Sequence, residues 1–158
     1  MKYTPTQQIP LFKVFMSPTI MDPLKEVIFS GYVTQGPKVD EFENVLSKFL
    51  DTPYVLSVNS GTSALHLALD LSGVKEGDEV ITTPMTCTAT NWPILTHKAK
   101  IVWADINANT GNIDPDSIKS KITKKTKAIM VVDWGGYPCD IDKIRSYVGN
   151  IPIIEDAA

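Results

Sequence analysis

From residue 54 onward the sequence alternates short apolar runs with segments of helical length, and this alternation allows few folds. The apolar runs show no polar alternation, which is typical of strands buried on both faces of a parallel sheet. A helix between consecutive strands is the pattern of βαβ units. The predicted strands are 54–58, 79–83, 100–104, 127–132 and one that begins at 151, and the predicted helices are 62–71, 86–95, 115–122 and 141–148. The sequence therefore predicts an α/β domain of three layers, with helices on both faces of a mostly parallel sheet.

The first 37 residues do not follow this alternation and form a separate predicted segment. Residues 1–20 are polar and contain three prolines, which indicates an arm. A short helix is predicted over 21–29, and 30–37 is a loop rich in turn residues. Pro37 suits the first turn of the next helix, predicted over 38–50 with Val39, Phe42, Leu46 and Phe49 on one face. The predicted division is thus 1–37 for the arm, helix and loop, and 38–158 for the α/β domain.

Composition excludes several classes of function. The 158 residues carry a net charge of −3, and interspersed charges give no attraction for nucleic acid or a membrane surface. Two cysteines, Cys87 and Cys139, provide neither a disulfide framework nor a metal-ligand spacing. The amino terminus lacks the apolar run of a signal peptide, and no segment is long enough to span a membrane. We therefore expect a cytoplasmic protein without a metal site.

The stretch 56–71 predicts a phosphate-binding turn. A short apolar run leads into Asn59, Ser60 and Gly61, and a helix follows. The first N–H groups of such a helix lack partners, and with the helix dipole and the hydroxyls of Thr62 and Ser63 they could hold an anion. Gly61 has no Cβ and lets the anion approach the backbone. An ordinary helix capped by Ser60 or Thr62 fits the same residues equally well.

Polar segments follow four of the predicted strands, and in a parallel sheet ligands bind beyond the carboxyl ends of the strands. These segments are 60–62, 84–91, 133–137 and Asp156. A phosphate site after the first strand and a carboxylate at the end of the fifth fit pyridoxal phosphate, whose ring nitrogen needs a carboxylate to stay protonated. By itself, Asp156 would more simply be a helix cap at the end of a strand.

At these motifs the sequence resembles the amino-terminal part of the DegT/DnrJ/StrS sugar aminotransferases. These are pyridoxal-phosphate enzymes of the fold-type-I aspartate aminotransferase superfamily. The resemblance runs from Ile9 to Ala158 in the family's order, and its motifs are GYVTQGP at 31–37, FE at 42–43, NSGTSAL at 59–65, GDEVI at 77–81, the block 84–91, the loop 135–140 and IEDAA at 154–158. It implies the first part of a large domain that continues beyond these residues.

The resemblance assigns roles to individual residues. Gly61, Thr62 and Ser63 match the positions that hold the cofactor phosphate, and Asp156 matches the partner of the pyridine nitrogen. Cys87 occupies the place where many members have an aromatic residue stacked on the cofactor ring.

Other candidates have simpler alternatives. A small buried apolar residue is the alternative interpretation of Cys87. Tyr32 lies in a loop that matches a substrate-facing segment and is a weaker candidate. Three residues at the predicted rim, Asp133, Trp134 and Tyr137, are explained equally well by packing of their loop. His66 is interpreted as a packed side chain and His97 as an exposed residue near a helix end.

In the family the catalytic lysine, which forms a Schiff base with the cofactor, lies further along the chain than the aspartate. The resemblance therefore places it beyond Ala158, and no catalytic residue is assigned here. The lysines at 121, 124, 125 and 127 are interpreted as a solvated turn. We expect a fragment, from a truncated reading frame or a split protein, that is inactive alone and leaves the strand 54–58 without a neighbour.

The resemblance implies an aminotransferase of amino-sugar or polysaccharide biosynthesis, acting as a homodimer. Its substrates would be a nucleotide-linked keto-sugar and an amine donor, usually glutamate or glutamine. Two alternatives stay open: a pyridoxal-phosphate-dependent sugar dehydratase of the same family, and an inactive fragment that only binds a partner chain or nucleotide. A generic nucleotide-binding domain is a further alternative, but its glycine-rich G-x-G-x-x-G turn is absent after the first strand.

Overall fold

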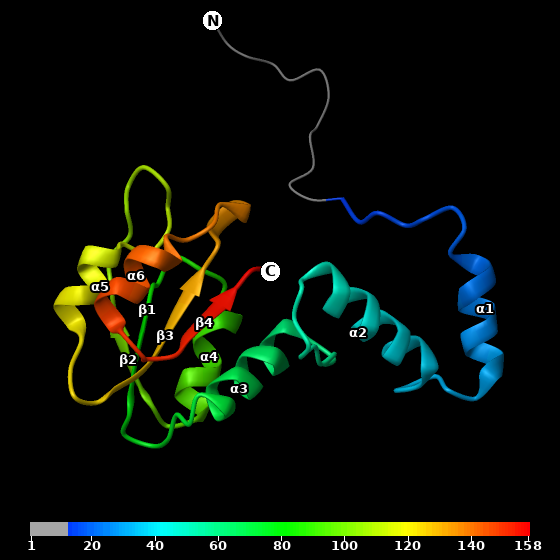
Figure 1. Cartoon of the computed structure of the whole chain (residues 1–158), viewed down its shortest axis with the longest axis horizontal. Coiled ribbons are helices and arrows are strands. Elements are labelled where there is room, and N and C mark those ends of the chain that lie inside the picture. The colour runs from blue at the N-terminus through cyan, green and yellow to red at the C-terminus, as the bar shows by residue number, and fades with distance from the viewer. Residues whose placement is uncertain (1–12) are drawn as a thin grey trace, which may run out of the picture. The chain divides into compact units, whose positions relative to one another are not determined.

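The computed structural model describes residues 13–158, and these form two compact units, 13–57 and 58–158 (Figure 1). Each unit is described by itself. The predicted amino-terminal arm lies mostly outside the described residues, as does the start of the family resemblance at Ile9. Among the described residues, no helix is both long enough and apolar enough to cross a membrane.

The first unit consists of two helices, α1 (Met21–Ser30) and α2 (Pro37–Phe49). Gly31 follows α1 with φ +83°, a left-handed conformation that glycine adopts without strain and that ends the helix. Pro37 begins α2, where its missing N–H costs no hydrogen bond. Both predicted helices are therefore confirmed, with boundaries shifted by one residue.

Neither α1 nor α2 buries a residue within the described chain. Phe42 and Phe49, on the predicted apolar face of α2, are 56% and 83% exposed. The helical periodicity thus predicted the helix correctly but not the burial of its apolar face.

The segment after α2 does not form a strand, so the predicted strand 54–58 is wrong. The Ser57 N–H donates to Glu43 Oε1 at 2.6 Å, and the Ser47 hydroxyl donates to the Thr52 carbonyl, which ties this segment to α2. A strand requires a neighbour that shares its ladder of hydrogen bonds. Within the described residues, 54–58 has no such neighbour, in agreement with the expectation that this segment is left unpaired.

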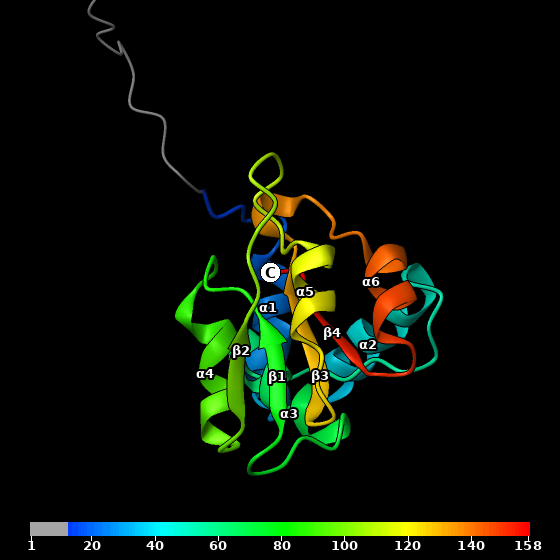
Figure 2. The ribbon, with the colours of Figure 1, turned by 90° about the vertical axis from the view of Figure 1, so that its left-hand side faces the viewer.

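The second unit is built on a four-stranded parallel sheet in the order β2-β1-β3-β4 (Figure 2). The strands are β1 (Glu79–Thr82), β2 (Lys100–Trp103), β3 (Thr126–Val132) and β4 (Ile153–Asp156). Four helices connect and cover them: α3 (Gly61–Leu71), α4 (Thr88–Thr96), α5 (Pro115–Lys121) and α6 (Ile141–Val148). The predicted alternation of strands and helices is confirmed from residue 61 to the end.

Alternate residues of the central strands face two separate hydrophobic cores. Val80 and Met130 pack with α3 and α4, whereas Ile81 and Val131 pack with α5 and α6. Figure 1 shows these two helix pairs on opposite sides of the strands. The domain therefore has the three predicted layers.

Burial of α3 is less complete than its composition predicts. Leu65 and Leu69 are buried against the sheet, but Leu71 is 81% exposed. A helix on the outside of a sheet buries one stripe, and apolar residues elsewhere on it stay in solvent.

Candidate functional site

The start of α3 forms the first part of the site. Ser60 Oγ accepts a hydrogen bond from the Ser63 N–H at 3.1 Å, so Ser60, and not Thr62, caps the helix. The Ser63 hydroxyl donates to Asn59 Oδ1 at 2.7 Å and closes the turn. The N–H groups of Gly61 and Thr62 and the Thr62 hydroxyl have no hydrogen-bond partner within the described chain. These donors sit at the positive end of the helix dipole and remain available to an anion.

Gly61 opens the space in front of these donors. A Cβ at this position would have no atom within 4 Å. Gly61 does not have a positive φ, so its backbone conformation does not require glycine. Open space beside the backbone is therefore the structural property that glycine provides here.

Asp156 ends β4 and forms the second part of the site. Its Oδ2 accepts a hydrogen bond from the Thr90 hydroxyl at 2.7 Å, and its Oδ1 is 3.3 Å from the Ala158 N–H, a long and weak contact. No lysine, arginine or histidine of residues 13–158 forms an ion pair with this half-buried carboxylate. Its negative charge is thus left for a cation that the described residues do not supply.

Asn91 fixes the helix that carries Thr90. Asn91 Oδ1 accepts a hydrogen bond from the Thr82 hydroxyl at 3.0 Å, and its Nδ2 donates to the Thr83 carbonyl at 3.0 Å. Thr82 and Thr83 end β1, so these bonds join α4 to the carboxyl end of a central strand. The block 84–91 was predicted to matter, but Thr90 and Asn91 were not predicted individually. Threonines and an asparagine inside an otherwise helical segment were the available signal.

The two parts of the site lie at the same edge of the sheet. Each helix of this unit ends shortly before the next strand begins, so the helices run opposite to the strands and start at the strands' carboxyl ends (Figure 1). Leu65 and Leu69 of α3 share a core cluster with Ile154 of β4. Gly61 is one turn before Leu65 and Asp156 is two residues after Ile154, which brings Gly61 and Asp156 to one edge.

Cys87 lies at the same edge, directly before α4. It is the N-cap residue, makes no side-chain capping bond and is exposed. The interpretation of Cys87 as a buried apolar residue is therefore wrong, while its stacking role stays a prediction. Tyr32 is exposed in the loop between α1 and α2 of the other unit, and its role also stays a prediction.

The loop after β3 is held by its own contacts. Asp133 Oδ1 accepts from the Cys139 N–H at 2.9 Å, and Asn112 bonds both the Trp134 N–H and the Tyr137 carbonyl. These bonds support the packing interpretation for Asp133, whereas Trp134 and Tyr137 take part through backbone atoms and their side chains are 42% and 59% exposed.

Two groups near this loop have raised pKa values. Burial, followed by the neighbouring Asp133 carboxyl, raises the pKa of the Cys139 thiol to about 12. Partial loss of hydration, and then Asp133, raises the pKa of Glu155. Neither Cys139 nor Glu155 was among the predicted site residues.

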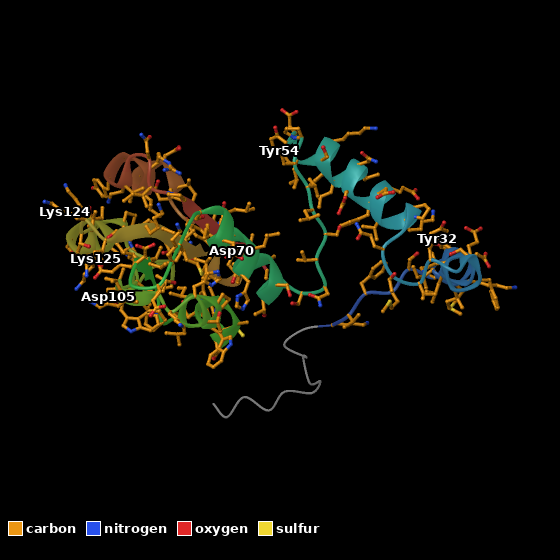
Figure 3. The ribbon with its side chains drawn as sticks, turned by 90° about the horizontal axis from the view of Figure 1, so that it is seen from below. Tyr32, Tyr54, Asp70, Asp105, Lys124 and Lys125 are labelled. Atoms are coloured by element: carbon orange, nitrogen blue, oxygen red, sulfur yellow. The ribbon has the colours of Figure 1, made fainter. Side chains whose placement is uncertain are left out.

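The histidines and lysines lie outside the candidate site. His66 Nδ1 contacts the Thr96 hydroxyl at 3.3 Å on the outer side of α3 and α4. The prediction that His97 is exposed is wrong: its side chain is 13% exposed and contacts Asp70 at 3.0 Å and the Pro93 carbonyl at 2.7 Å. Lys124 and Lys125 are exposed just before β3, at the amino end of that strand, and Figure 3 shows them pointing outward.

Residues 16–158 match the DegT/DnrJ/EryC1/StrS aminotransferase family. The spore coat polysaccharide biosynthesis protein SpsC of Bacillus subtilis is 42% identical over 135 residues, which cover 84% of this chain and 35% of SpsC.

Solved structures give the same result. The sugar aminotransferase CalS13 of Micromonospora echinospora superimposes with a TM-score of 0.90 at 42% identity, over 96% of this chain and 43% of CalS13. The PMP-form of Spr1654 of Streptococcus pneumoniae, described as a putative sugar aminotransferase, gives 0.91 at 33% identity, with the same coverage of both chains. The chain thus spans less than half the length of these relatives and corresponds to an amino-terminal portion of them. The predicted α/β fold is confirmed, and the chain belongs to the DegT/DnrJ/EryC1/StrS aminotransferase family.

Proposed function

We propose that this chain provides the cofactor-binding part of a pyridoxal-phosphate-dependent aminotransferase. The enzyme would transfer an amino group from glutamate to a nucleotide-linked keto-sugar. Membership of the family and similarity to sugar aminotransferases support this proposal. The observation that carries it is the pairing, at one sheet edge, of donors beside Gly61 with a carboxylate; among residues 13–158 the donors have no hydrogen-bond acceptor and the carboxylate has no cation.

The residues present fit the cofactor. The free N–H groups of Gly61 and Thr62 and the Thr62 hydroxyl would bind its phosphate, with Ser63 holding the turn. Asp156 would face its ring nitrogen and keep that nitrogen protonated, and Cys87 would lie near the ring. When bound, the cofactor supplies the electron sink and carries the amino group. In the same proposal Tyr32 faces the substrate and the working enzyme is a homodimer.

Binding of pyridoxamine phosphate to the whole chain tests the cofactor site, because this form of the cofactor needs no lysine to hold it. Titration calorimetry should give saturable binding, and pyridoxamine without its phosphate should bind far more weakly. Absence of binding, or equal binding of the two compounds, contradicts the proposal.

Gly61→Ala tests whether the cofactor phosphate binds beside Gly61. The added methyl group enters open space in the free chain and favours helix formation, so stability should stay equal or rise. The same methyl group blocks the anion, and we expect the affinity for pyridoxamine phosphate to fall by at least about tenfold. Unchanged affinity in this variant would show that the phosphate binds elsewhere.

The substrate class is tested by a second titration. A keto-sugar linked to a nucleoside diphosphate is added to the chain loaded with pyridoxamine phosphate, with the free sugar and the free nucleotide as controls. The proposal expects the linked sugar to bind more tightly than either control. Equal binding of the linked sugar and the nucleotide favours a site that recognises the nucleotide alone.

A further inference from the structure

The Thr90 hydroxyl has two possible partners, and only one of them can receive its hydrogen. Thr90 is 1% exposed, and its oxygen lies 2.7 Å from both Asp156 Oδ2 and the Thr86 hydroxyl. An ionised carboxylate only accepts hydrogen bonds, so the single Thr90 hydrogen goes to Asp156. The Thr86 hydroxyl must then donate to Thr90. The two hydrogen bonds therefore run in one direction, from the Thr86 hydroxyl to Thr90 and from the Thr90 hydroxyl to Asp156.

A threonine inside a helix has a local alternative that Thr90 does not use. Helical hydroxyls commonly donate to a backbone carbonyl three or four residues earlier. Four other residues of this unit do so, including Thr96, which donates to the Pro93 carbonyl at the end of the same helix; the others are Ser72, Ser120 and Ser146. Thr90 instead contacts a residue 66 positions away in the sequence. Thr90 could have formed a hydrogen bond within its own helix, so the contact with Asp156 is not needed merely to give its hydroxyl a partner.

The position of Thr90 is set by its neighbour. Asn91 is 9% exposed and bonds both Thr82 and Thr83 at the end of β1. A rotation or shift of α4 that moved Thr90 away from Asp156 would break these two bonds. Thr90 is therefore held as a rigid donor.

We propose that Thr90, supported by Thr86, is a positioning residue for Asp156. Thr90 donates to Oδ2 and limits rotation of the carboxylate, which leaves Oδ1, with only the weak Ala158 contact, as the more open oxygen for a cationic N–H. The role toward the cofactor rests on the proposed function, whereas the contact between Thr90 and Asp156 is independent of it.

A double-mutant cycle in the cofactor-free chain tests the contact. Thr90→Val keeps the shape and removes the hydroxyl, and the unfolding equilibrium constant should rise roughly ten- to a hundredfold. In an Asp156→Ala background the same change should alter that constant by less than about threefold, because the acceptor is gone. Thr90→Ser keeps the hydroxyl, so its effect should still depend on Asp156, apart from a loss for the buried methyl group that is equal in both backgrounds. Equal effects of Thr90→Val in both backgrounds would overturn the proposal.

The protonation of bound pyridoxamine phosphate tests the positioning role. Absorbance against pH reports the point at which the bound ring nitrogen loses its proton. We expect this point to move to lower pH in Thr90→Val and to be restored in Thr90→Ser. Thr96→Val, which removes a hydroxyl that bonds within the same helix, should leave it unchanged. A Thr90→Val chain that binds more weakly with the same protonation point would show a structural role only and would overturn the positioning role.

The two proposals fail in different ways. If the original chain does not bind pyridoxamine phosphate, the proposed function is contradicted, and the double-mutant cycle alone decides whether Thr90 positions Asp156. If the cofactor binds and Gly61→Ala weakens it, while Thr90→Val leaves both the coupling and the protonation point unchanged, the function stands and the positioning role is wrong.

Discussion

Replacing Asn91 with alanine should loosen α4 from the sheet. Asn91 makes two hydrogen bonds to the end of β1, each with a net value of about 0.5–1.5 kcal/mol. The change also leaves the Thr82 hydroxyl, which is 0% exposed, without its acceptor, at a cost of roughly 1–3 kcal/mol. Because these contributions overlap, we expect the free energy of unfolding to fall by about 2–4 kcal/mol.

Tryptophan fluorescence during urea unfolding measures this loss in the unit concerned. The three tryptophans, at 92, 103 and 134, all lie in residues 58–158. The signal therefore comes from that unit. Far-ultraviolet circular dichroism provides a second probe that does not depend on Trp92, the direct neighbour of Asn91.

Thr82→Val is the matched control for this prediction. It removes one hydrogen bond and leaves the bond from Asn91 to the Thr83 carbonyl, so the expected loss is about 1 kcal/mol. With valine already at 82, Asn91→Ala no longer strands a buried hydroxyl, and the double variant should lose less than the sum of the two changes. Full additivity, or a loss below about 1 kcal/mol for Asn91→Ala, would refute the reasoning.

Three further predictions follow from other parts of the second unit. In the folded chain at about pH 8, a thiol reagent should modify the exposed Cys87 rapidly and Cys139 only after unfolding, because burial raises the pKa of Cys139 to about 12; equal rates for the two thiols would contradict this. In the native state the pKa of Glu155 is raised above its ordinary value of 4.5, so the carboxyl keeps its proton at pH values where the unfolded chain has lost it. Stability therefore falls as the pH rises from 4.5 through the native pKa. Glu155→Gln should therefore stabilise the chain at about pH 7 by roughly a few tenths of a kcal/mol and have no effect below about pH 4, as urea unfolding at the two pH values would show. Gly111→Ala should destabilise by about 1–3 kcal/mol in thermal unfolding, because Gly111 has φ +78° and a Cβ would come within 2.8 Å of Trp134 Cδ1; a variant as stable as the original chain would be the contrary result.

The alternation of apolar runs and helical segments was sufficient to predict the second unit. Runs such as 127–132 have no polar face, so they can be buried only between two layers of helices, and this property is local to the sequence. The order of the strands, β2-β1-β3-β4, depends on pairing between distant segments. The same dependence explains the error at 54–58, because β propensity produces a strand only where a neighbour completes the ladder.

A phosphate site and a carboxylate could be predicted from the residues alone, because a capped turn at 59–63 and an acidic residue after an apolar run are local features. Only the tertiary structure placed Gly61 and Asp156 at one sheet edge and directed the Thr90 hydroxyl to Asp156. The physical reason is that a hydrogen bond between residues 66 positions apart depends on how a helix and a strand pack, and side-chain packing is not encoded in the spacing of the residues along the chain.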